Sequence, residues 1–182
     1  MITVKPPLDA LIGIEGAYSN DPNDSGGETI WGITVAVARA FGYLGAMKDM
    51  TQFQAKEIYL ARFWVQPRFD QVAEVNGTIA LELFDTGVNM GSGTASKFLQ
   101  RALNVLNKGG TIFPDMVVDG AVGKMTLIAL STFLTARGGA GVKVLMAMLN
   151  SQQSVRYMEL AEQRHKDESF EFGWQDNRVV MS

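Results

Sequence analysis

The sequence predicts an α+β fold that is predominantly helical and carries one small β-hairpin. Two observations predict it: apolar residues recur at helical spacing along most of the 182 residues, and one early stretch is too rich in turn residues for a helix. Hydrophobic residues make up 47% and charged residues 19%, as in ordinary globular proteins. The chain can therefore form one domain with a proper core, or two small lobes that share one.

The N-terminal region predicts a helix, a hairpin and a second helix. Apolar residues from Leu8 to Ile14 predict the first helix over residues 7–17. A hairpin or irregular β region is expected over residues 19–33, because the density of Asn, Asp and Gly there opposes a helix. The second helix begins at Thr34 and is expected to stop near residues 42–45, where two glycines occur.

The rest of the chain reads as helices with recognisable caps. Thr51 and Gln54 have the spacing of a capping box. Asn76 is expected to cap the next buried helix. The expected apolar face of the helix that Thr51 begins includes Phe53, Ile58 and Phe63. The later expected elements are a helix over 77–89, a helix over 94–106, a loop over 108–119, a helix over 122–136 and a long helix over 140–165.

No linker interrupts the composition, so the lobes are expected to pack as one unit. We expect a catalytic lobe over residues 1–91 and a helical lobe over residues 92–182 packed on it. The pairs Gly109-Gly110 and Gly138-Gly139 mark turns between helices.

Composition excludes several functional classes. The net charge of −3 and the absence of a Lys/Arg-rich stripe argue against nucleic-acid binding. The chain has no cysteine and one histidine, His165, so no thiolate or histidine metal site and no cofactor is expected. The N-terminus does not have the pattern of a signal peptide, and no run of about 18 apolar residues predicts stable membrane insertion.

Glu15 is the candidate general acid. It ends an apolar helical pattern and precedes a polar segment full of turn residues. Desolvation on one side of such a carboxyl can raise its pKa, while the other side still faces a substrate, as cleavage of a glycosidic bond requires. The alternative is a glutamate that pairs with an arginine or caps backbone amides.

The segment 14–34 contains a series of ordered motif residues, which are Glu15, Gly16, Tyr18, Asp21, Pro22, Asp24, Gly26, Gly27, Thr29, Gly32, Ile33 and Thr34. This series resembles the signature of glycoside hydrolase family 108, the N-acetylmuramidases of phage endolysins and certain secretion-associated muramidases. Ala17 replaces the usual second glycine, and Ile30-Trp31 stands where Asn-Tyr is common.

The resemblance continues through two later blocks. Residues 84–91, Phe-Asp-Thr-Gly-Val-Asn-Met-Gly, resemble a second family motif, and residues 99–103 with 118–126 resemble its peptidoglycan-binding C-terminal region. The resemblance implies a lysozyme-like fold with the hairpin at the active site. It implies a lysozyme-type peptidoglycan hydrolase that needs no cofactor.

The second catalytic group is open between three residues. Asp24 lies nine residues after Glu15, a spacing that resembles phage-type lysozymes, whereas Asp21 can equally form a turn or bind substrate. Thr29 could position the attacking water or serve only as a hairpin residue. Tyr18 and Trp31 are candidate substrate-binding residues, although either could simply pack.

Asp85 and Asn89 lie four residues apart, on one face of a helix. They could line the saccharide cleft, or they could cap the helix end and hold the lobe in place. We favour the structural role for Asp85 and leave Asn89 open.

The leading functional hypothesis is a muramidase that cleaves the β-1,4 bond between N-acetylmuramic acid and N-acetylglucosamine. The alternatives are a lytic transglycosylase on the same substrate and a non-catalytic wall-binding module. We expect a monomer that is made in the bacterial cytoplasm without a signal peptide and acts on peptidoglycan in the periplasm. A holin or a secretion system would give it access. Phage or bacterial origin stays open.

Overall fold

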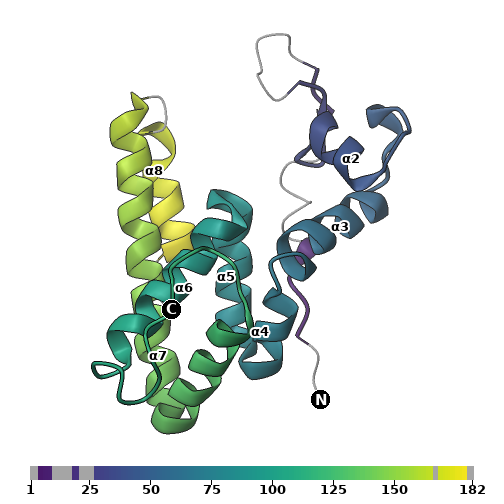
Figure 1. Ribbon diagram of the computed structural model, residues 1–182. Helices are drawn as coiled ribbons and strands as arrows, with labels where there is room; N and C mark the ends of the chain where they lie inside the picture. The colour runs from purple at the N-terminus through teal and green to yellow at the C-terminus, as the bar shows by residue number, and fades with distance from the viewer. Residues whose placement is uncertain (1–3, 10–17, 21–26, 166–167, 180–182) are drawn as a thin grey trace. The chain divides into compact units, whose positions relative to one another are not determined.

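Helices dominate the computed structural model, with one two-stranded antiparallel sheet (Figure 1). The structure describes residues 4–9, 18–20, 27–165 and 168–179. The predicted α+β class with predominant helix is confirmed. The chain divides into two compact units, residues 5–66 and residues 67–182, the first four residues belonging with the second unit. Each unit is described by itself.

The hairpin of the first unit is built around two residues with positive φ. Strand β1, Thr29–Ile30, pairs with β2, Ile33–Thr34, so that Thr29 faces Thr34. The turn between them consists of Trp31 at φ 54° and Gly32 at φ 71°, the backbone signs of a two-residue type I′ turn. Ser19 forms an isolated antiparallel bridge with Thr29. Within the region 19–33 predicted as a hairpin or irregular β structure, the described residues contain this hairpin, whose second strand extends to Thr34, and the bridge at Ser19, while residues 21–26 lie outside the described residues.

The helices that follow begin and end where local capping signals predict. Helix α2, Val35–Phe41, is capped by the Thr34 hydroxyl and ends at Gly42, which has φ 98°. A 3₁₀ turn η1, Met47–Asp49, precedes α3, Gln52–Leu60, whose capping box consists of Thr51 and Gln54 as predicted. Helix α3 continues into the π-helical segment η2, Ala61–Val65.

The predicted apolar face of α3 needs correction. Phe53 is 71% exposed, whereas Ile58 is buried and Phe63 is half-buried. The helix instead buries Ala55, Ile58 and Tyr59. Position 53 lies in the first turn, ahead of this buried face, so sequence periodicity assigned it to the wrong side.

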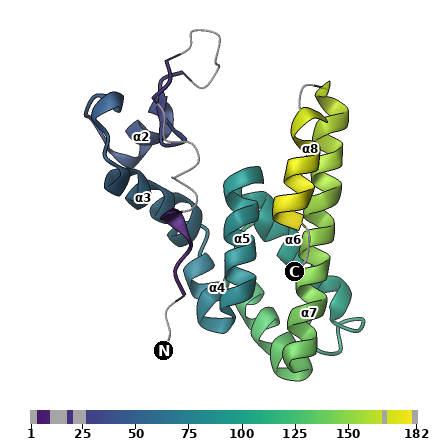
Figure 2. The same ribbon diagram turned by 180° about the vertical axis from the view of Figure 1, so that it is seen from behind.

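The second unit is a helical bundle around α5 (Figures 1 and 2). Helix α5, Gly77–Met90, is capped by Asn76 as predicted and packs against three other helices of the unit. Those helices are α4, Phe69–Val75; α6, Ser92–Leu106; and α7, Lys124–Gln163. The largest fully buried side chains of this core are Phe69, Ile79, Leu83, Leu99, Leu103, Leu130, Phe133 and Leu145.

Helix α7 changes direction at Gly138, whose φ of 54° and ψ of −144° are not helical. The two helices predicted over 122–136 and 140–165 are therefore present as the two halves of α7, joined at this kink. By length and composition α7 is apolar enough to cross a membrane, which sequence inspection did not anticipate. Its two halves bury Leu130, Phe133 and Leu145 in the protein core, as helices of a folded bundle do.

The sequence did not predict α4 or the C-terminal elements α8, Glu168–Trp174, and η4, Gln175–Val179. Helix α8 lies along α7 in both views, and Trp174 stacks on Tyr157 with ring centroids 5.0 Å apart. Ser154 donates a hydrogen bond to Gln175 at 2.8 Å. These contacts attach the C-terminal segment to the second half of α7.

Candidate active site

Tyr18 and Glu28 form a hydrogen-bonded pair beside the hairpin. The Tyr18 hydroxyl donates to Glu28 Oε1 at 2.8 Å, and the bridge between Ser19 and Thr29 brings the two segments together. This hydrogen bond, with the negative charge of Glu28, raises the pKa of the Tyr18 hydroxyl above its usual value of 10.0. Glu28, which sequence inspection did not single out as a site residue, is half-buried and accepts this hydrogen bond.

Thr29 lies in β1 with its hydroxyl directed to the backbone. The hydroxyl donates to the Gly27 carbonyl oxygen at 3.1 Å. Its proton is thus used within the hairpin, and its oxygen keeps lone pairs that can accept a hydrogen bond from water. The geometry therefore allows both predicted roles, hairpin residue and water-positioning residue.

Trp31 is anchored at the hairpin turn. The indole Nε1 donates to the Met50 carbonyl oxygen at 2.8 Å, and the Tyr59 hydroxyl donates to the Trp31 carbonyl oxygen at 3.3 Å. A non-glycine residue at φ 54° carries backbone strain of about 1–3 kcal/mol, which these contacts offset. The remaining surface of the ring is half-buried, so Trp31 is a rigid aromatic surface at the hairpin tip.

Three predicted residues, Glu15, Asp21 and Asp24, lie outside the described residues. Their roles stay predictions. The described site residues nearest to them in sequence are Tyr18, Glu28 and Thr29.

Asp85 and Asn89 belong to the second unit, on α5. Asn89 Nδ2 donates to the Asp85 carbonyl oxygen at 2.8 Å. The Asp85 carboxylate accepts from Arg178 Nη1 at 2.7 Å and from Gln153 Nε2 at 3.3 Å. Asp85 therefore ties α5 to α7 and η4. Asn89 is exposed, and both of its predicted roles stay open.

One turn before Asp85, Glu82 forms a half-buried acidic site that sequence inspection missed. The Thr86 hydroxyl donates to Glu82 Oε1 at 3.3 Å, and the Asn150 amide donates to its two carboxylate oxygens at 3.2 and 3.3 Å. Burial, together with the charge of Asp85, raises the pKa of Glu82 to about 7. Its neighbours on α7 lie almost 70 positions away, so no local pattern could indicate them.

Within the described ranges no three histidine, cysteine or acidic residues gather into a group that could hold a metal ion. The chemistry open to the hairpin is that of carboxyl and hydroxyl groups. Such groups can donate a proton to a leaving oxygen and hold a water molecule, the two tasks of glycoside hydrolysis.

Comparison with known proteins identifies both parts of the chain. Residues 8–91 match the family described as Glycosyl hydrolase 108, and residues 94–179 match the family described as Predicted Peptidoglycan domain. A solved structure of Brucella abortus SagA is similar with a TM-score of 0.64 and 21% identity, over 96% of this chain and 94% of that chain. No curated protein matches. Residues 8–91 therefore form a glycosyl hydrolase 108 domain and residues 94–179 a peptidoglycan domain, and the two together support a glycoside hydrolase that acts on peptidoglycan.

Proposed function

We propose that the chain is an N-acetylmuramidase. It hydrolyses the β-1,4 bond between N-acetylmuramic acid and N-acetylglucosamine, with Glu15 as the general acid. The observation that carries the proposal is the hairpin that follows Glu15, in which Tyr18, Glu28 and Thr29 are held together by the Ser19–Thr29 bridge. Polar groups fixed on a small β-hairpin are what a cleft for a polar sugar needs.

The proton moves from Glu15 to the glycosidic oxygen as the bond to the anomeric carbon breaks. The developing positive charge on the sugar is stabilised by a carboxylate, for which Asp24 is our candidate, or is met by water from the opposite face. Thr29 can accept a hydrogen bond from that water. Asp21, Tyr18 and Trp31 are our candidates for contacts to the sugar rings.

Product analysis tests the proposed bond. Purified sacculi are digested with the chain, and the soluble products are analysed by mass spectrometry with and without borohydride reduction. We expect reducible N-acetylmuramic acid ends. Reducible N-acetylglucosamine ends would assign the other glycosidic bond, and 1,6-anhydro ends would assign a lytic transglycosylase. No soluble product from permeabilised cells or sacculi would favour a non-catalytic wall-binding module.

The substrate also sets where the protein acts. We propose that the chain is made in the bacterial cytoplasm and reaches the periplasmic cell wall through a holin or a secretion system. Expression with and without a co-expressed holin tests this route, since cell turbidity should fall only when the holin is present. A fall without any holin would favour a different route.

A further inference from the structure

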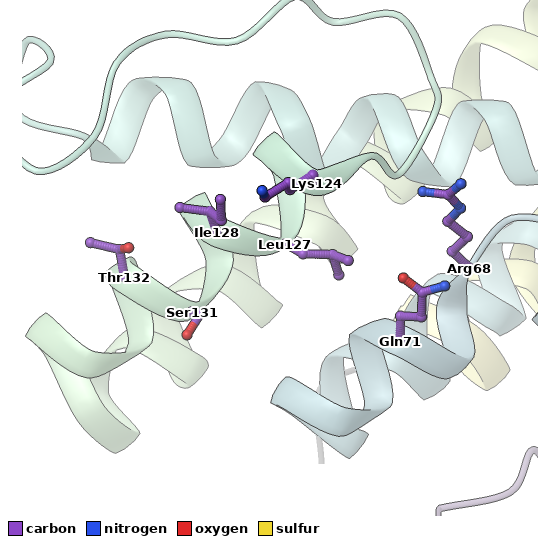
Figure 3. A pocket seen from close by; sticks show the side chains of 7 residues that line it. All are labelled: Arg68, Gln71, Lys124, Leu127, Ile128, Ser131 and Thr132. Carbon is purple, nitrogen blue, oxygen red and sulfur yellow. The ribbon is translucent and has the colours of Figure 1, made fainter.

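A pocket of about 390 Å³ lies between α4 and the first half of α7, within the second unit (Figure 3). Arg68 and Gln71 contribute from the α4 side. Across from them, the first two turns of α7 contribute Lys124, Leu127 and Ile128. Ser131 and Thr132 complete the lining one turn later. The hydrolysis proposed above does not use this site.

Local structure fixes both walls of the pocket. Arg68 has φ 64° and ψ 30°, and its carbonyl oxygen accepts from the Gln71 and Val72 amides at 3.2 Å each, so it starts α4 from a left-handed conformation. A non-glycine residue held in this conformation is strained, and such residues concentrate at functional sites. This left-handed backbone conformation sets the direction in which the Arg68 side chain leaves the backbone.

The opposite wall is fixed by a buried glutamine. Gln100 donates to Asp119 Oδ1 at 2.8 Å and accepts from the Gly120 amide at 2.9 Å, which holds the turn just before α7. The hydrogen bond from Gln100 lowers the pKa of Asp119, so the Asp119 carboxylate that accepts this bond in the turn stays ionised. This turn determines where α7 begins and therefore where Lys124 lies.

The polar side chains that line the pocket have hydrogen-bond donors that no described residue uses. Among the described residues, neither Arg68 nor Lys124 has an ion-pair partner, and the side chains of Gln71, Ser131 and Thr132 make no hydrogen bond. By contrast, the nearby Thr135 hydroxyl donates to the Ser131 carbonyl oxygen at 2.8 Å. Among the described residues, those that line the pocket include two cations and no acidic residue.

We propose that this pocket binds the carboxylates of the peptide part of peptidoglycan. This inference rests on the proposed substrate. An arginine fork and a lysine ammonium match carboxylate oxygens, and the hydroxyls and the amide can donate further hydrogen bonds. Leu127 and Ile128 offer an apolar wall to the methyl and methylene groups of a short peptide rich in alanine. A sugar hydroxyl alone would not require two cations.

Because the chain as a whole is acidic, attraction to the anionic cell-wall polymer has to come from local basic groups. With a net charge of −3, the protein as a whole does not attract an anionic polymer. The five residues contributed by α7 lie in the segment that matches the peptidoglycan domain, residues 94–179. The pocket would therefore hold the peptide while the hydrolase domain acts on the glycan strand.

Peptide binding by the full chain tests the inference. The probe is a synthetic peptide, L-alanyl-γ-D-glutamyl-meso-diaminopimelic acid, titrated into the protein by calorimetry or NMR. We expect Arg68→Gln combined with Lys124→Gln to weaken binding at least about tenfold, which corresponds to about 1.4 kcal/mol. The same peptide with its carboxylates amidated should bind wild type at least about tenfold more weakly. Circular dichroism checks that the variant folds.

The matched control is Arg137→Gln combined with Lys143→Gln, two exposed cations of α7 that do not line the pocket. It removes the same charge and should leave peptide affinity within about twofold. Equal losses in both double variants, undetectable binding by wild type, or equal binding of inorganic phosphate would each overturn the inference. Cleavage of peptide-free glycan strands is measured in parallel. If the wild-type chain binds the peptide but does not cleave these peptide-free strands, the muramidase proposal is refuted, whereas the inference that the pocket binds peptide still holds.

Discussion

At the scale of single residues, the hairpin places two carboxylates in competition for the role of acid. Glu28 is described, half-buried, and bonded to Tyr18, whereas Glu15 is assigned from its motif. The Glu28 carboxylate is already engaged by the Tyr18 hydroxyl, whereas Glu15 is the glutamate of the family motif, so we assign the proton to Glu15.

Replacing Glu15 by Gln removes the proton donor and keeps the size of the side chain. We expect the rate of sacculus digestion to fall at least about a hundredfold, the typical contribution of general acid catalysis, with unchanged circular dichroism. Glu28→Gln is the matched control and should lose less than about tenfold. The reverse order, with Glu28→Gln inactive and Glu15→Gln active, would move the acid to Glu28.

The second catalytic group can be tested with Asp24 and Thr29. Asparagine forms the same turn as aspartate, so Asp24→Asn separates charge from turn formation. We expect the rate to fall at least about tenfold if Asp24 is a base or electrostatic partner, with thermal stability unchanged. Thr29→Ala should lower the rate as well, whereas Thr29→Ser keeps the hydroxyl and should retain most activity. Full activity in Asp24→Asn would transfer the role to Asp21, Thr29 or the substrate itself.

Glu82 predicts a measurable dependence of stability on pH. Its pKa is raised from 4.5 to about 7 on folding, so the protonated form favours the folded state. This contribution is complete below about pH 4.5 and is lost as the pH rises to about 7. Glu82→Gln should therefore nearly match wild type near pH 4.5 and be more stable by about 3 kcal/mol at pH 8, in urea unfolding.

The exposed Glu74 on α4 provides the control for this measurement. Glu74→Gln removes the same charge without removing a buried carboxyl, so its difference from wild type should not change between pH 4.5 and pH 8. A pH-independent effect of Glu82→Gln would mean that folding does not raise the pKa of the Glu82 carboxyl.

At the scale of secondary-structure elements, sequence inspection succeeded where the signal is local. Thr51 with Gln54, and Asn76 with the Ile79 amide, cap helices through contacts three residues apart, so the pattern is visible in the chain itself. Helix α4 has only seven residues, too few for an apolar period, and it starts from Arg68 in a conformation that usually indicates glycine or asparagine. Helix α8 is equally short and is attached to α7 by distant partners.

The kink in α7 offers a test at this scale. Gly138 has a backbone conformation that nearly only glycine adopts, whereas Gly139 has no positive φ. Beyond the adjacent helix backbone, a Cβ added at either position would meet no atom of the described residues within 4 Å. Gly138→Ala should therefore destabilise the protein by about 1–3 kcal/mol through the backbone alone. Gly139→Ala should be neutral or stabilising by up to about 1 kcal/mol, because alanine favours helix. Chemical denaturation of the two variants measures the difference. Equal effects would mean that α7 runs straight through this point in solution.

At the scale of the whole molecule, the ordered motifs identified the families, while the contacts between distant segments could not be predicted. The pair Asp85 and Arg178 is separated by 93 positions, and no residue near either one signals the other. The packing boundary after Gln66 likewise differs from the boundary near residue 92 that separates the two family matches. Short motifs indicate the residues that take part in the chemistry, whereas packing depends on apolar side chains from every part of the chain. The expected lobe boundary after residue 91 therefore stays a prediction.

Composition supports the final prediction, that catalysis needs no metal ion. The whole chain has no cysteine and a single histidine, and its His165 side chain is 89% exposed and contacts Glu168. Proton transfer by carboxyl groups needs no Lewis acid. We therefore expect digestion of sacculi to proceed at an unchanged rate after exhaustive EDTA treatment and dialysis. Because EDTA also strips ions that stabilise the outer membrane of intact cells, purified sacculi are the proper substrate. Loss of turnover that Mg²⁺, Ca²⁺ or Zn²⁺ restores, with the Glu15→Gln variant inactive at every ion concentration, would require a metal beside the acid and would contradict a mechanism based on carboxyl groups alone.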